Sequence, residues 1–117
     1  SELISGEVLK PWGSYKTFEQ GEGYLVKRMT VLPDEILSLQ SHNHRSEYWF
    51  VAEGVATVEC DSETKLLSKH ESTFIPLGAK HRLSNMGEEI LKVIEVQVGD
   101  ELREDDIIRY EDRYDRN

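Results

Sequence analysis

Short runs of β-branched and aromatic residues recur along this chain, and turn signals separate them at intervals of about eight to twelve residues. No run in the middle of the chain keeps a sustained helical period. This rhythm predicts an all-β sandwich or barrel. We expect strands at residues 15–19, 24–32, 36–40, 48–53, 56–60, 65–67, 72–75, 81–84 and 90–98.

At 117 residues the chain has the length of one domain with a single core. We expect one domain over residues 1–117, with the β core at about 12–99 and a C-terminal tail at 100–117. The tail has mixed charge with scattered Ile and Tyr residues. We expect it to form a short helix or a strand laid against the barrel or a partner subunit, with a frayed end as the alternative.

The chain is acidic, with 14 Lys and Arg against 23 Asp and Glu and a net charge of −9. This balance argues against nucleic-acid binding through a broad basic face, so any anionic ligand must be held locally.

No apolar run approaches the ~20 residues of a membrane span, and the N-terminus lacks the features of a signal peptide, so we expect a cytoplasmic protein. The single cysteine, Cys60, is interpreted as a small apolar residue near a strand end rather than a nucleophile.

Two short segments concentrate side chains that bind metals: QSHNHRSE at 40–47 and PLGAKHRLSN at 76–85. They offer imidazole nitrogens, a carboxylate and an amide oxygen, from His42, His44, His81, Glu47 and Gln40. We therefore predict a divalent-metal site built from two neighbouring hairpins. The alternative is a set of solvated surface histidines.

The second segment also carries turn chemistry. Pro76 fixes φ and Gly78 permits a positive φ, so this turn is expected to deliver His81 to the start of the next strand. Residues 85–87, Asn-Met-Gly, predict a further turn.

Strand alternation predicts a polar cavity. In YLVKRMTVL, Lys27 shares a face with Leu25, Met29 and Val31, and in ILKVIEVQV, Glu95 and Gln97 share a face with Leu91 and Val93. Charged residues on an otherwise inward face indicate a cavity that binds a polar ligand. The alternative buries the opposite faces, with Val26 or with Ile94, Val96 and Val98 pointing inward.

With these residues in view, the chain resembles the cupins, small double-stranded β-helix or jelly-roll barrels. Their first sequence block, G-x5-H-x-H-x4-E-x6-G, fits here with Gln40 in the first histidine position, followed by His42, Glu47 and Gly54. The resemblance implies that Gln40, His42, Glu47 and His81 are the metal ligands. The competing register pairs His42 with His44 but leaves a shorter gap to Glu47.

The chain also resembles the C-terminal isomerase domain of the type II phosphomannose isomerases. The segments KPWGSYKTFEQGEGYLVKRMTVLPDEILSLQSHNHRSEYWFVAEGVATVE, STFIPLGAKHRLSN, VIEVQVGD and EDDIIRYEDRY carry this similarity, over about residues 8–116. It implies a metal-dependent isomerase that interconverts mannose 6-phosphate and fructose 6-phosphate through an enediol. Zinc is the expected ion, and manganese, cobalt, nickel and iron suit the same ligand types. The family commonly joins this domain to a mannose-1-phosphate guanylyltransferase, but no Gly-rich nucleotide-binding loop occurs in this polypeptide, so we expect no guanylyl transfer from it.

An aldose–ketose isomerase needs a base, a cation for the enediolate oxygens and a phosphate site. We expect Lys27 to contact substrate oxygens or phosphate and Glu95 to act as general base or to anchor a ligand histidine. Arg45, Lys80 and Arg82 flank the ligands and are the phosphate candidates, and Arg82 is also a candidate for the catalytic set. Solvated surface positions are the alternative for these three.

Some residues depart from the family pattern. Asp34 and His70 stand where cupins usually have turn glycines, which indicates turns that tolerate a side chain. Tyr48 replaces a frequent histidine, and alternation from Glu47 points it away from the cavity. The aromatic residues Trp12, Trp49, Phe50 and Phe74 are interpreted as core.

Because one fold hosts many activities, two rival functions remain. One is a non-catalytic module that binds a sugar or sugar phosphate beside a separate guanylyltransferase. The other is an iron-dependent dioxygenase, since two histidines and one carboxylate are its usual ligands. Exposed edge strands and the aromatic tail predict a homodimer.

Overall fold

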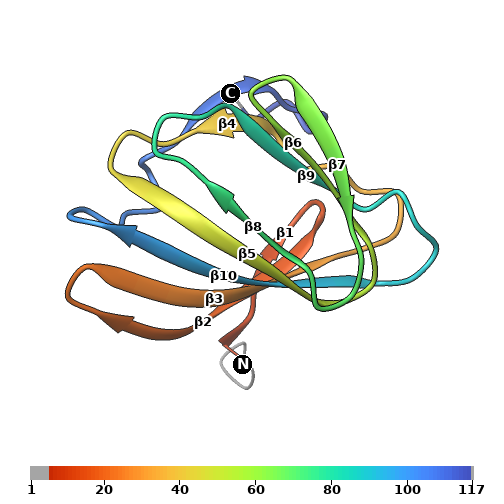
Figure 1. Ribbon diagram of the computed structural model, residues 1–117, viewed down its shortest axis with the longest axis horizontal. Coiled ribbons are helices and arrows are strands. Elements are labelled where there is room, and N and C mark those ends of the chain that lie inside the picture. The colour runs from red at the N-terminus through yellow and green to blue at the C-terminus, as the bar shows by residue number, and fades with distance from the viewer. Residues whose placement is uncertain (1–5, 117) are drawn as a thin grey trace.

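The computed structural model describes residues 6–116, and its elements are strands in two antiparallel sheets (Figure 1). The six-stranded sheet has the order β1 (Val8–Lys10), β2 (Gly13–Gly21), β3 (Tyr24–Val31), β10 (Leu91–Gly99), β5 (Arg45–Glu53) and β8 (Ser72–Ile75). The five-stranded sheet has the order β11 (Ile108–Glu111), β4 (Leu39–Ser41), β9 (His81–Ser84), β6 (Ala56–Cys60) and β7 (Glu63–Leu67). The all-β prediction is confirmed.

Every expected strand overlaps an observed one, but the segment 36–40 is less regular than expected. Only an isolated bridge joins Ile36 to Ser84 before β4 begins at Leu39. Two backbone hydrogen bonds flank this bridge. The Asn85 N–H donates to the Glu35 carbonyl at 2.9 Å, and the Leu37 N–H donates to the Leu83 carbonyl at 3.0 Å. The strand β1 was not expected, whereas β11 lies in the tail, for which a strand was one of the expected forms.

Asp34 and His70 were expected in turns where a glycine is usual, and the structure confirms this. Asp34 has a φ of 66° and His70 a φ of 75°, the left-handed region in which a glycine is the usual residue. Both residues are exposed. These turns therefore tolerate a side chain in the left-handed region, as expected.

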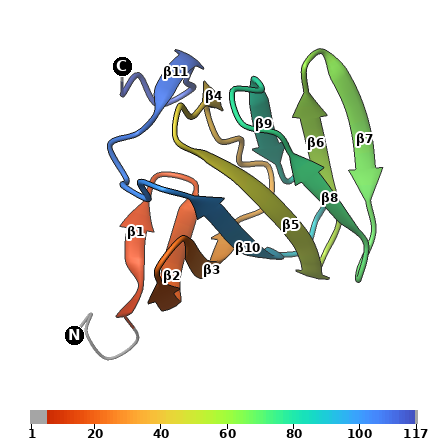
Figure 2. The same ribbon diagram turned by 60° about the vertical axis from the view of Figure 1, so that its left-hand side comes forward.

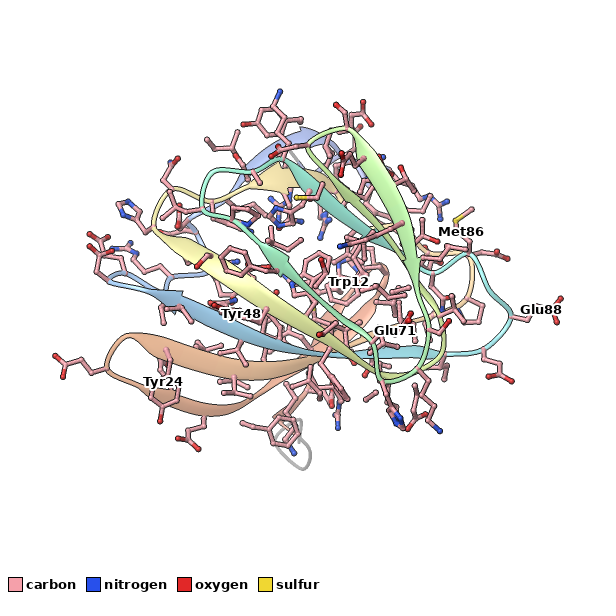
Figure 3. The ribbon with its side chains drawn as sticks, viewed as in Figure 1. Trp12, Tyr24, Tyr48, Glu71, Met86 and Glu88 are labelled. Atoms are coloured by element: carbon pink, nitrogen blue, oxygen red, sulfur yellow. The ribbon has the colours of Figure 1, made fainter. Side chains whose placement is uncertain are left out.

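The hydrophobic core lies between the two sheets. Its members come from both inner faces, and Figure 3 shows Trp12 between the sheets while Met86 and Glu88 project from the β9–β10 connection. The fully buried aliphatic residues on β3, β5, β6, β9 and β10 include Val31, Val51, Val58, Leu83, Leu91 and Val93. The expected inward faces of β3 and β10 are confirmed, because Lys27, Glu95 and Gln97 are buried beside this core.

The aromatic prediction was only half right. Trp12 and Trp49 belong to the core, but Phe50 is 40% exposed and Phe74 is 46% exposed. Phe50 follows Trp49 on the same strand, so alternation places it on the outer face of the sheet. Tyr48, on that same outer face, is 52% exposed and points away from the cavity as expected.

The C-terminal tail is part of the barrel rather than a frayed end. After β10, residues 100–107 cross from the six-stranded sheet to the five-stranded sheet, where β11 pairs with β4 (Figure 2). Of the alternatives for the tail, the strand laid against the barrel is the one observed. Within residues 6–116 no helix is both long and apolar enough to cross a bilayer.

Candidate functional site

Strand register gathers the polar inward residues at one end of the barrel. In the six-stranded sheet, Glu95 of β10 pairs with Lys27 of β3 on one side and with Trp49 of β5 on the other. One pleat further along, Gln97 pairs with Glu47. Because directly paired residues share a face, these side chains all lie on the inner face of the sheet. Lys27, Trp49, Glu47 and Glu95 line it.

Three buried side chains form a cluster suited to a metal ion, and two of them, Glu47 and His81, also line this cavity. Candidate ligand atoms of His42, Glu47 and His81 all lie within 4.8 Å of one another. The Nε2 atom of His42 is 3.3 Å from Glu47 Oε2, and the Nε2 atom of His81 is 3.9 Å from Glu47 Oε1. Residues from two sequence segments, on both sheets, thus converge as the sequence predicted.

Backbone carbonyls orient both imidazoles. His42 donates from Nδ1 to the Asp106 carbonyl at 2.7 Å, and His81 donates from Nδ1 to the Ala79 carbonyl at 3.0 Å. Each Nε2 atom is thereby left as the acceptor that faces Glu47, the arrangement in which a second hydrogen bond fixes a ligand histidine.

Electrostatics keep both rings neutral. Burial, together with the nearby Arg45 guanidinium, lowers the pKa of His42 to about 4. Burial also lowers the pKa of His81. Neutral imidazoles are the form that binds a cation, so the donor set fits a divalent metal.

The turn before His81 has the expected geometry. Gly78 adopts a φ of 82° and donates its N–H to the His42 carbonyl at 3.2 Å, and the Ala79 N–H closes the turn on the Pro76 carbonyl at 3.1 Å. One turn therefore joins the two ligand segments and starts β9 at His81. The next turn also forms, because the Asn85 side chain accepts the Gly87 N–H at 3.0 Å.

Gln40 and His44 differ in placement. Gln40 lines the cavity and pairs directly with His81 across β4 and β9. Its amide nitrogen donates to Ser38 Oγ at 2.9 Å, which leaves the amide oxygen to serve as an acceptor or a ligand. His44 has a side chain that is 44% exposed and lies 4.0 Å from Asp100, away from the cluster. The alternative ligand role of His44 is therefore not supported.

Arg45, which was expected to flank the ligands as a phosphate candidate, contacts the cluster itself and does not occupy a solvated surface position. Its side chain is buried, and Nε donates to Glu47 Oε2 at 2.7 Å. The Nη2 atom of Arg45 lies 3.2 Å from His42 Nε2, and its Nη1 atom donates to the Arg103 carbonyl at 3.2 Å. The guanidinium thus neutralises the Glu47 carboxylate and occupies acceptor atoms that a metal ion also needs.

Glu95 is a buried carboxyl beside the cluster. Burial, and then the charge of Glu47, raise its pKa to about 7, although Lys27 opposes this. A single indole N–H, Trp49 Nε1, donates to Glu47 Oε1 at 2.9 Å and to Glu95 Oε2 at 3.0 Å. The Gln97 amide donates to the other oxygen of Glu95 at 2.9 Å. The carboxyl is fixed in position and poised to exchange a proton near neutral pH.

Lys27 completes the polar group. Its Nζ atom lies 3.7 Å from Glu95, 3.2 Å from Glu104 and 4.2 Å above the ring centre of Tyr15. Burial alone would lower the pKa of Lys27, but the charges of Glu95 and Glu104 outweigh it and raise that pKa. Lys27 therefore stays cationic inside the cavity.

Two expected phosphate residues lie elsewhere. Arg82 follows His81 on β9 and points to the opposite face, where it donates to the Leu37 carbonyl at 3.0 Å and pairs with Glu111 at 3.2 Å. Lys80 is exposed and stacks over the Tyr110 ring at 4.3 Å. Neither side chain lines the cavity, so the expectation that they face bound phosphate is corrected.

Several residues that build the site were missed. The tail contributes Asp106, whose carboxylate accepts the Asn43 and His44 N–H groups at 2.9 Å and so fixes the loop after His42. Arg109 and Arg116, also from the tail, line the cavity. Their placement depends on the pairing of β11 with β4, for which the sequence carries no local signal. Trp49 was missed as a polar contact, although alternation from Glu47 could have placed it on the inward face.

Comparisons with known proteins agree with this architecture. Residues 2–112 match the family described as mannose-6-phosphate isomerase C-terminal. Mannose-1-phosphate guanylyltransferase ManC of Salmonella typhimurium is 53% identical over 110 residues, which are 94% of this chain and 23% of the relative. Alginate biosynthesis protein AlgA of Pseudomonas aeruginosa is 51% identical over 110 residues, with the same two shares. The chain thus spans about a quarter of the length of these curated relatives.

Solved structures identify the fold. KdgF from Halomonas sp. superposes with a TM-score of 0.73 at 16% identity, over 84% of this chain and 86% of that chain. The cupin domain of Schizosaccharomyces pombe Cnp3 superposes with a TM-score of 0.70 at 14% identity, over 74% of this chain and 64% of that chain. The expected cupin barrel is confirmed. Since the family match runs through both sheets and every residue of the buried polar cluster, the chain belongs to the mannose-6-phosphate isomerase C-terminal family.

Proposed function

We propose that this chain is a metal-dependent isomerase that interconverts mannose 6-phosphate and fructose 6-phosphate through an enediol. The observation that carries the proposal is the position of the Glu95 carboxyl, which shares the Trp49 N–H with Glu47 of the buried His42–Glu47–His81 cluster. A base beside a cation site is what proton transfer between two adjacent carbons requires. A supply of mannose phosphates for polysaccharide synthesis agrees with the names of relatives in alginate and xanthan biosynthesis.

His42, Glu47 and His81 would hold the ion, with the Gln40 amide oxygen as the fourth ligand. A bound divalent cation would act as a Lewis acid towards the neighbouring carbonyl and hydroxyl oxygens of the sugar. Zinc is the ion we propose, because nitrogen and carboxylate ligands in a set of four suit it. The buried, neutral imidazoles and the Glu47 carboxylate are the chain's contribution to its binding.

We assign proton transfer to Glu95 and substrate contacts to Lys27 and Arg45. Glu95, as the carboxylate, would remove the proton from carbon 2 of mannose 6-phosphate and deliver it to carbon 1. Lys27, 3.7 Å from Glu95, would hold that carboxylate ionised and contact a sugar oxygen. Arg45 would leave its Glu47 and His42 contacts when the ion binds and turn its charge towards the substrate.

Removal and return of the metal test this function. The purified protein is treated with chelator, dialysed and assayed with mannose 6-phosphate before and after addition of zinc, manganese, cobalt, nickel or ferrous iron. Formation of fructose 6-phosphate only in the reloaded samples supports the isomerase. If every reloaded sample binds metal and the sugar phosphate without turnover, the chain is instead a sugar-phosphate-binding module.

A second candidate rests on the same ligand geometry. Two histidines and one carboxylate are also the ligand set of non-haem iron oxygenases. Oxygen consumption by the ferrous protein, without isomerisation, would favour that reading. Homodimer formation stays a separate prediction, to be checked by sedimentation.

A further inference from the structure

Arg109 occupies a position in the cavity wall that neither the metal cluster nor the proton-transfer group uses. It lies on β11 and pairs directly with Gln40 of β4, which in turn pairs with His81 of β9. Arg109, Gln40 and His81 thus form one row on the inner face of the five-stranded sheet. Two strand spacings separate Arg109 from His81, roughly 10 Å.

The guanidinium of Arg109 has no hydrogen-bond or ion-pair partner within residues 6–116. Its Nε atom is buried and has no hydrogen-bond acceptor among the described residues, and no ion pair joins Arg109 to a carboxylate of residues 6–116. The neighbouring arginines differ, because Arg45 pairs with Glu47 and Arg116 pairs with Asp112. A buried donor without an acceptor is costly, so its presence at a cavity wall points to an acceptor that a ligand brings.

The cavity is locally cationic in an acidic protein. Its described lining holds five basic side chains, Lys10, Lys27, Arg45, Arg109 and Arg116, against three carboxylates, Glu47, Glu95 and Glu104. The chain as a whole carries a net charge of −9. Positive lining inside a negatively charged surface concentrates an anion at this one place. Of the five basic groups, Lys27, Arg45 and Arg116 already contact carboxylates. Lys10 lies over the Tyr15 ring at 5.8 Å, so Lys10 and Arg109 carry the charge left for a ligand, and of these two Arg109 is the one with a buried, unpaired donor.

We propose that Arg109 binds the phosphate group of a phosphosugar, two strands away from His81 in the same row of the inner face. A guanidinium offers paired N–H donors that match two phosphate oxygens. The inference rests on the proposed function for the identity of the sugar, and it replaces Arg82 and Lys80 as the phosphate residues.

Binding measurements on matched variants test this role. Mannose 6-phosphate, mannose and inorganic phosphate are titrated into the metal-loaded wild type, Arg109→Gln, Arg109→Lys and the control Arg113→Ala. Arg113 is a tail arginine that contacts Asp34 and Glu35 outside the cavity. Arg109→Gln should weaken mannose 6-phosphate binding by at least about tenfold, with Arg109→Lys intermediate, while mannose binding and Arg113→Ala stay unchanged.

A measurement on the unaltered protein guards against misfolding of the variants. The side-chain Nε–H resonance of Arg109, assigned by its absence from the Arg109→Lys spectrum, should shift with mannose 6-phosphate and with inorganic phosphate but not with mannose. If the wild type binds mannose 6-phosphate while this resonance and the Arg109→Gln affinity do not change, Arg109 is not the phosphate residue and the proposed function stands. If the wild type binds mannose 6-phosphate no better than mannose, both proposals are overturned.

Discussion

The two ends of strands β3 and β10 face the same barrel interior with opposite chemistry. At one end Met29 and Val31 pack against Leu91 and Val93 in an apolar core. At the other end, on the same faces, lie Lys27, Glu95 and Gln97. The alternation of a strand places both sets equally well, so the difference lies in what each end does. The apolar end stabilises the fold, and the polar end holds the groups for which we propose metal binding and catalysis.

Burial of charge at the polar end is balanced locally. An unpaired charge in such a place would be costly, but Lys27 contacts Glu95 and Glu104, and Arg45 contacts Glu47. These ion pairs add little to the net free energy of folding, because the cost of desolvating the charges offsets most of their attraction. Net stability must therefore come from the apolar end, and variants at the two ends should fail in different ways.

The largest expected effect is loss of metal at the polar end. His81→Ala removes one of the two imidazoles that face Glu47, so the variant should lose its bound ion and all isomerase activity. His44→Ala is the matched control, because that histidine lies outside the cluster. Metal content after dialysis measures the effect. Full occupancy in His81→Ala would remove this residue from the ligand set.

Glu95→Gln should separate chemistry from metal binding. Loss of the base should lower turnover by about 10²–10⁴-fold, while metal content and folding are retained. Glu53→Gln, which removes an exposed carboxylate paired with Lys92, serves as control. Steady-state rates and metal analysis on the same samples make the comparison. Turnover within a few-fold of the wild type would assign the base to another group.

Leu91→Ala should show the reverse pattern at the apolar end. Leu91 is fully buried, and its truncation should lower the free energy of unfolding by about 2–5 kcal/mol. The folded fraction should still bind metal. Ile90→Ala, at a position that is 43% exposed, should change stability far less. Urea unfolding measures both variants, and equal losses in the two would contradict the assigned core.

The smallest expected effect concerns the tail that closes the polar end. Burial alone would raise the pKa of Asp112, but hydrogen bonds from Arg116 and Tyr114 lower it to about 2. Since an unfolded aspartate titrates near 3.9, this carboxylate stabilises the fold above about pH 4 and the contribution is lost as the pH falls through 2. Asp112→Asn should therefore cost about 1–2 kcal/mol at pH 7 and almost nothing near pH 2.

Unfolding of Asp112→Asn and wild type at several pH values measures this difference. Asp115→Asn, an exposed neighbour, is the control. A stability difference that does not depend on pH would mean that the ionised carboxylate is not what fastens the tail.

Much of the polar end could be predicted from local pattern. The candidate ligands His42, Glu47 and His81 came from two short segments rich in metal-binding side chains and from the resemblance to the cupins. Alternation placed Lys27 and Glu95 inward, because that signal acts over a few residues of one strand. The same rule, applied to His81, excludes Arg82 from the cavity, so that error was avoidable. Trp49 could likewise have been found by alternation from Glu47. Roles in metal binding and catalysis stay predictions for all of these residues.

The contribution of the tail to the site could not be predicted from local sequence patterns. Arg109 reaches the cavity only because β11 pairs with β4, about 70 residues earlier in the chain. Asp106 contacts His42 and His44 for the same reason. Pairing between distant segments depends on the assembled barrel, and a short segment of mixed charge carries no periodic signal of it. The site is thus built from a locally encoded half and a half that exists only in the folded chain.

The most direct test of the polar end as an isomerase site is incubation of the metal-loaded protein with mannose 6-phosphate in heavy water, followed by NMR. The enediol route predicts fructose 6-phosphate together with solvent deuterium at carbon 2 of the recovered mannose 6-phosphate, and neither in Glu95→Gln. Absence of both conversion and exchange, with metal and sugar phosphate shown to be bound, would contradict it.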